Sequence, residues 1–151
     1  MATFNSVNKT KQDVNVPPTI VPQGEINARM KVQYDEFSHT ASPSTGDTVE
    51  FLPLPVGARI HDACIIHPTL GANGLVSLGW KAGEVETADA DGFVVAGATK
   101  NQALNKFMSA VVGVAGQFKK FSEAITPVMT FDEGPSTAAV TYKVAIYYTI
   151  D

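Results

Sequence analysis

The sequence predicts an all-β domain: an antiparallel β-sandwich or jelly roll, with an extended N-terminal arm and at most one short helix. Three observations support this prediction. Six apolar residues occupy every second position over 140–150, which is the period of a strand with one buried face. Several other short apolar segments are separated by turn-forming residues, as in sandwiches and jelly rolls. No repeat of roughly 20–50 residues is visible, which excludes solenoids and propellers.

Length and composition fit a single folded domain of 151 residues. Charged residues make up only 17% of the chain, too few for a long disordered protein. The net charge of −4 argues against nucleic-acid binding, because phosphate contacts need clustered Lys and Arg. No apolar run approaches the ~18 residues of a membrane span, and the N-terminus lacks the apolar core of a signal peptide. The single cysteine, Cys64, excludes an internal disulfide and fits a reducing cytoplasm.

Residues 1–24 are predicted to form the extended arm, and residues 25–151 a single jelly-roll-like domain. The arm is polar and contains prolines, which disfavour helix at and before their own positions. Such a segment either frays or becomes ordered against a partner. In the second case its anchors would be four spaced aliphatic residues, Val14, Val16, Ile20 and Val21.

The first half of the domain predicts three strands joined by turns. Apolar residues at every second position over 28–35 predict a half-buried strand. A Ser/Thr/Pro/Gly-rich loop at 42–47 leads to a second predicted strand over 48–54. A Pro- and Gly-containing turn at 55–58 then precedes an apolar third strand over 59–67.

The middle of the chain predicts a hairpin, a loop and a helix. Gly and Asn at 71–74 suit a tight turn, with 75–81 as the returning strand. The acidic stretch 82–92 is predicted to be a solvated loop. Residues 99–102 have the spacing of a helix capping box and predict one short helix. Apolar residues follow at helical spacing: Leu104, Phe107, Met108 and Val111.

Two predicted strands complete the domain, over 124–132 and 140–150, with a turn at 133–136 between them. The last strand carries β-branched and aromatic residues on its apolar face, which favours strand over helix. The expected order of elements is therefore almost entirely β.

No constellation of residues predicts catalysis, a cofactor or a metal, so a non-enzymatic protein is expected. Cys64 lies within a predicted core strand, where a free cysteine behaves as a small hydrophobic residue, whereas a nucleophile would need a partner base and some exposure. His61 and His67 would stand ~20 Å apart along one strand, too far for a joint site. The 89–92 stretch resembles a fragment of a calcium loop but lacks the later ligands, including the closing glutamate.

One motif of the chain resembles a known family. The turn LPLPVGARI at 52–60 leads into a core strand at 62–66, and the hairpin LGANGLVSLGW follows at 70–80. This pattern resembles virion structural proteins of tailed bacteriophages, in which an acidic stretch like 88–93 and an alternating terminal strand like 138–150 often follow. Small phage proteins of this kind look like capsid decoration (cement) proteins with jelly-roll folds.

The resemblance implies a decoration protein, made in the cytoplasm of the bacterial host, that binds the outer surface of the major capsid protein shell. It would stabilise the shell by bridging neighbouring subunits. Arg59 heads a strand and is expected to contact the partner, with the arm aliphatics, by pairing a carboxylate across the interface. Jelly rolls often form oligomers, so a symmetric dimer or trimer is expected, without nucleic-acid or membrane partners.

Two alternatives remain open. Within a virion, the protein could be a head–tail connector or tail component present in few copies. In a different class, it could be a carbohydrate- or receptor-binding module that stacks a sugar on Trp80 or on loop tyrosines. A single Trp at the end of a hydrophobic strand, however, is more often a core residue.

Overall fold

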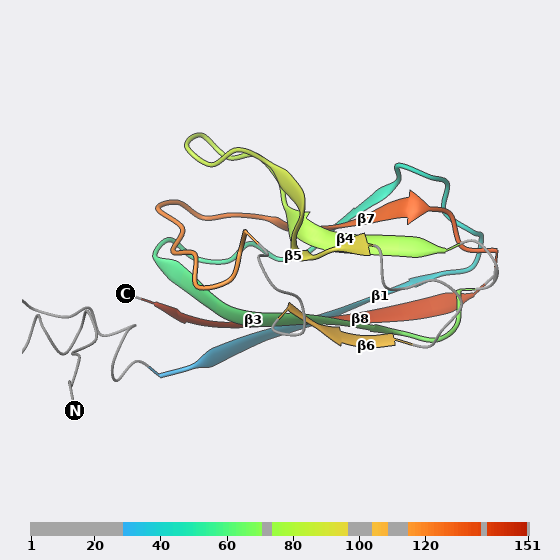
Figure 1. Cartoon of the computed structure of the whole chain (residues 1–151), viewed down its shortest axis with the longest axis horizontal. Coiled ribbons are helices and arrows are strands. Elements are labelled where there is room, and N and C mark those ends of the chain that lie inside the picture. The colour runs from blue at the N-terminus through green and yellow to red at the C-terminus, as the bar shows by residue number, and fades with distance from the viewer. Residues whose placement is uncertain (1–28, 71–73, 97–103, 109–114, 137–138, 151) are drawn as a thin grey trace, which may run out of the picture.

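The computed structural model describes residues 29–70, 74–96, 104–108, 115–136 and 139–150 (Figure 1). The strands in these residues are β1 (Lys31–His39), β2 (Thr48–Glu50), β3 (Ala58–His67), β4 (Leu75–Trp80), β5 (Asp89–Val94), β6 (Leu104–Phe107), β7 (Pro127–Glu133) and β8 (Val140–Ile150). No helix long and apolar enough to span a membrane occurs in this described part. The predicted arm, residues 1–24, lies outside it.

The strands form two antiparallel sheets packed face to face, as the two layers in Figure 1 show. One sheet has the order β1-β8-β3-β6, and the other has the order β2-β7-β4-β5. The chain therefore crosses between sheets at every connection except the one from β4 to β5. The prediction of an all-β antiparallel sandwich is confirmed.

The core lies between the sheets, and burial alternates most clearly along β8, whereas β4 is buried over Val76–Trp80. In β8 the four inward-facing residues are at most 2% exposed, whereas Thr141 and Lys143 between them are exposed. Those four residues are Val140, Tyr142, Val144 and Ile146. Over Val140–Ile146 the alternation in the sequence corresponds to one buried and one outer face, but at the end of β8 it is reversed, with Thr149 buried and Ile150 exposed.

Aromatic residues fill the two halves of this core. The rings of Phe131 and Tyr142 meet edge to face, with centroids 5.5 Å apart. Trp80 packs against Phe93 at 5.0 Å and Phe121 at 5.1 Å. Edge-to-face and tilted arrangements of this kind are the favoured geometries of aromatic pairs, so they add to the gain from burial.

The prediction of a short helix beginning near residue 99 is wrong at Leu104–Phe107. These residues form β6, which pairs antiparallel with β3 through Cys64↔Phe107 and His67↔Leu104. The rest of the predicted helix, except the buried Met108, lies outside the described residues. Pairing with a neighbouring strand overrides the helical spacing, because local propensity is weaker than tertiary contact.

The boundaries of three predicted elements also differ from the structure. The predicted loop at 82–92 is wrong from residue 89 onward, since β5 begins there and pairs with β4 at Trp80↔Asp89. Acidic residues are tolerated because β5 is an edge strand with one face in solvent. β1 extends to His39, beyond the predicted 28–35, and β2 covers only three residues of the predicted 48–54.

Candidate partner-binding surface

One end of the sandwich gathers exposed apolar side chains. We call it the entry end, because the chain enters β1 there. It comprises the starts of β1 and β3, the connection from β2 to β3, the segment 115–121 and the end of β8. Its exposed large hydrophobic residues are Met30, Leu52, Val56, Phe118 and Ile150. They lie on segments that meet at one end of the sandwich, and groups of exposed apolar residues mark interaction sites more often than isolated ones do.

Hydrogen bonds and strand pairing bring these segments together. Ile150 lies opposite Ala58 at the start of β3. The side-chain amide of Gln33 in β1 donates to the carbonyl of Leu52 at 2.5 Å. In Figure 1 the starts of β1 and β3 and the end of β8 lie at the same end of the two layers.

Phe118 is the most unusual residue of the entry end. It is 60% exposed, yet its backbone has a φ of 59°, a conformation that bulky residues rarely adopt. Its N–H donates to the carbonyl of Ile60 at 2.8 Å, and its ring meets His61 edge to face at 6.0 Å. Backbone strain costs about 1–2 kcal/mol at such a position and persists where neighbours hold it, often at functional sites.

Arg59 is a predicted partner contact, and the structure places it at the entry end. Its Nη1 donates to the carbonyl of Phe118 at 3.3 Å. Arg59 therefore helps to hold the strained segment, a role the sequence did not indicate. The other predicted contacts, Val14, Val16, Ile20 and Val21, lie outside the described residues.

A second protruding feature is the hairpin between β4 and β5, residues 81–88, which rises from the sandwich in Figure 1. Val85 at its tip is 72% exposed. The carboxylate of Glu123 accepts three backbone N–H bonds, from Glu84 at 2.9 Å, Val85 at 3.0 Å and Glu86 at 2.7 Å. These bonds lower the pKa of Glu123, because they favour its charged form.

Glu123→Gln should loosen this hairpin, because an amide has one acceptor oxygen and no charge to hold three N–H groups. We expect the amides of residues 84–86 to exchange with solvent about tenfold faster or more, while the amides of β8 keep their rates. Hydrogen exchange followed by NMR measures this.

Glu50→Gln is the matched control, since Glu50 only pairs with Lys81 at 2.8 Å on the surface. Equal exchange of residues 84–86 in both variants would contradict the clamp. The lowered pKa of Glu123 adds a pH dependence: the stabilisation is present above the ordinary glutamate range and is lost as the pH falls through the folded pKa.

Trp80 does not offer a sugar-binding face. It is 4% exposed, and its Nε1 donates to the carbonyl of Thr87 at 2.9 Å. Lys119 Nζ lies over the ring, 5.6 Å from its centroid. This placement removes the residue on which the carbohydrate-binding alternative chiefly depends.

Burial shifts the pKa of several titratable residues that the sequence analysis singled out. Cys64 is buried, and burial raises the pKa of its thiol, so the thiolate is disfavoured. Burial lowers the pKa of His67, whose Nδ1 donates to the carbonyl of Pro68 at 2.7 Å. The pKa of Asp91 is raised by partial burial and by Asp89. The described residues hold no group of three side chains suited to a metal ion.

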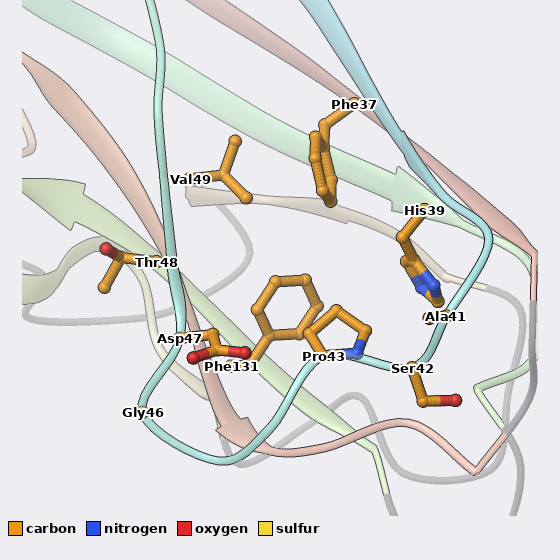
Figure 2. Close-up of a pocket in the computed structure, with 10 residues that line it drawn as sticks. All are labelled: Phe37, His39, Ala41, Ser42, Pro43, Gly46, Asp47, Thr48, Val49 and Phe131. Carbon is orange, nitrogen blue, oxygen red and sulfur yellow. The ribbon is translucent and has the colours of Figure 1, made fainter.

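A recess of about 600 Å³ opens between β1 and β2, and Figure 2 shows the residues that line it. Its wall contains the aromatic residues Phe37 and Phe131 and the buried His39. The carboxylate of Asp47 accepts a hydrogen bond from the N–H of Ser44 at 2.7 Å, within the loop that borders the recess. The recess therefore has aromatic residues in its wall and is bordered by a loop that a hydrogen bond between two of its own residues stabilises.

No known family model and no curated protein sequence matches the chain. Among solved structures, a chain of the cyanophage Pam1 capsid asymmetric unit is similar to it, with a TM-score of 0.64 and 16% identity over 100% of both chains. A chain of the capsid of Ralstonia phage GP4 is similar with a TM-score of 0.60 and 21% identity, over 93% of this chain and 94% of that one. At these identities the likeness shows a shared fold.

Proposed function

We propose that this chain is a structural protein of a phage virion, and more specifically a decoration (cement) protein on the outer surface of the major capsid protein shell. The observation that carries the proposal is the nearly end-to-end likeness of its fold to chains in two phage capsid structures. The motif over residues 52–80 supports it independently, because that resemblance rests on sequence rather than on fold.

The sandwich itself is proposed to be a jelly roll. Its strands pair in a nested order, with β1 beside β8, β2 beside β7, β3 beside β6 and β4 beside β5. Two interlocked Greek keys of eight strands produce this order. Jelly rolls occur in many viral capsid proteins, which is consistent with the proposed function.

The entry end is the surface proposed to face the shell. Exposed apolar residues, a strained aromatic side chain and Arg59 meet there. Aromatic and Arg side chains are enriched at the energetic centres of interfaces. A protein that binds only the assembled lattice stabilises it by the binding free energy, multiplied over many copies.

The copy number of the protein in purified particles tests the proposal directly. Quantitative peptide mass spectrometry against the major capsid protein should give hundreds of copies per particle for a decoration protein. About a dozen copies would assign it instead to the head–tail connector or the tail. Absence from particles would overturn the virion assignment.

The predicted arm is proposed to extend the contact to a second subunit, since about 20 extended residues reach up to ~65 Å. Deletion of residues 2–23 should leave the domain folded, because the described sandwich contains none of them. Attachment to particles should weaken at least about tenfold, as anchoring side chains are lost. Co-sedimentation with particles measures this, and unchanged attachment of the folded truncation would refute the role of the arm.

A further inference from the structure

Among the described strands, β1 is the longest and most regular edge strand, and its charged residues are Lys31, Asp35 and Glu36. It is nine residues long, contains no proline, and pairs with β8 one to one, without a register shift. The other edge strands are shorter, β2 with three residues and β6 with four, or irregular, as is β5. Natural sheets protect their edges by shortness, bulges, proline or charge, so a long regular edge marks a site for another strand.

The outer face of β1 is apolar beside that open edge. Val32 is 55% exposed and Tyr34 is 57% exposed. Across β8 they lie opposite Tyr147 and Ala145. An added strand would therefore extend an apolar surface on this face and gain hydrogen bonds along the edge.

The sequence of β1 is complementary to itself in one antiparallel register. Residues that lie directly opposite each other on paired strands share one face of the sheet. When two copies of one strand pair about a two-fold axis normal to the sheet, the axis must therefore lie midway between a residue and the same residue of the other copy. With the axis at Gln33, Lys31 lies opposite Asp35 on both sides, and Val32 lies opposite Tyr34. Opposite charges and apolar pairs at these positions stabilise strand pairing.

Neighbouring registers lack this complementarity. An axis at Asp35 would place two aspartates opposite each other, which is destabilising. An axis at Tyr34 would pair Gln33 with Asp35 and Val32 with Glu36, and it would leave Lys31 opposite an aromatic residue. The Gln33 register alone, among these three, combines both charge pairs with an apolar patch.

We propose that β1 is the site of self-association: two copies of this chain pair β1 with β1, antiparallel and centred on Gln33, to form one continuous sheet across a two-fold axis. This goes beyond the proposed function and does not depend on it, because the interface is formed by this chain alone. The entry-end residues Leu52, Val56 and Phe118 lie on other segments and stay available for a different partner.

Charge exchange tests the register on the full chain. Light scattering after size-exclusion chromatography should show twice the mass of the chain at micromolar concentration. Lys31→Glu and Asp35→Lys should each raise the dimer dissociation constant about tenfold or more, because each creates two like-charge pairs across the axis. The double variant restores opposite charges and should return to within about threefold of the original value.

Cysteine cross-linking tests the axis itself. Gln33→Cys places the two thiols opposite each other, within disulfide reach, so mild oxidation should give a covalent dimer. Glu36→Cys is the matched control on the same strand, since its two copies would be about 20 Å apart. The native Cys64 is 3% exposed and does not compete.

Three results would overturn the proposal. The first is a monomer at ~100 µM or a trimer for the unmodified chain; the second is a charge-exchanged double variant as weak as the single ones. The third is cross-linking that is no better at position 33 than at position 36. Circular dichroism of every variant separates these outcomes from a loss of fold.

Discussion

Phe118→Asn should weaken attachment to capsids about thirtyfold while leaving the domain at least as stable. The ring is 60% exposed at the entry end, so its removal takes apolar surface from the proposed interface and not from the core. A loss of about 2 kcal/mol is typical of an aromatic residue at the centre of an interface and corresponds to this factor. Co-sedimentation of the variant with particles that lack the protein measures it.

The stability of the same variant carries independent information. Asn tolerates the left-handed conformation better than Phe, so a φ of 59° should cost less after the exchange. Thermal unfolding should therefore show an unchanged or higher Tm. Ile66→Asn is the control, because it removes a 38% exposed apolar side chain at the opposite end of β3, away from the entry end. Equal attachment of both variants would show that Phe118 is not a contact.

Gly79→Ala should be the most destabilising single-methyl change in the described part of the chain. A Cβ at this position would lie 1.8 Å from the carbonyl oxygen of Asp89 and 2.6 Å from the carbonyl carbon of Ala90. Both atoms belong to the backbone of β5 and cannot rotate away, so β4 and β5 must separate. We expect a loss of about 4 kcal/mol or more, a large fraction of an ordinary stability. Urea unfolding measures it.

Gly46→Ala is the control that measures the cost of an unfavourable backbone conformation without a steric clash of the added methyl group. Gly46 has a φ of 90°, but a Cβ there would meet nothing within 4 Å. Its replacement should cost only the conformational penalty, about 1–2 kcal/mol. If Gly79→Ala costs no more than that, the contact between β4 and β5 is looser than the structure indicates.

The sequence predicted the sandwich because its strongest signals are local. The alternation in β8 reports one buried face, and such a pattern fits no other regular structure. The helix near residue 104 was wrong because helical spacing in a short apolar segment does not exclude a strand, and pairing with β3 decided the outcome. Sheet order is likewise set by contacts between distant segments, which no local pattern reveals.

The candidate surface was less predictable than the fold. Arg59 was identified from its place at the start of a strand, but its bond to Phe118 depends on a segment almost 60 residues away. Nothing in the residues around Phe118 indicates a positive φ, because bulky side chains disfavour it. The open edge of β1 became visible only when the lengths of the other edge strands were known.

The pairing of the first strand with the last has a consequence for synthesis. Lys31 lies opposite Tyr148, so these two residues are 117 positions apart in the chain. At about 5–20 residues per second a ribosome needs roughly 6–23 seconds to make the second partner after the first. During that time β1 has no strand to pair with, because β8 is its only neighbour in the sheet among the described strands. The sandwich therefore closes only after β8 has been made, and until then the unpaired β1 strand is exposed to aggregation.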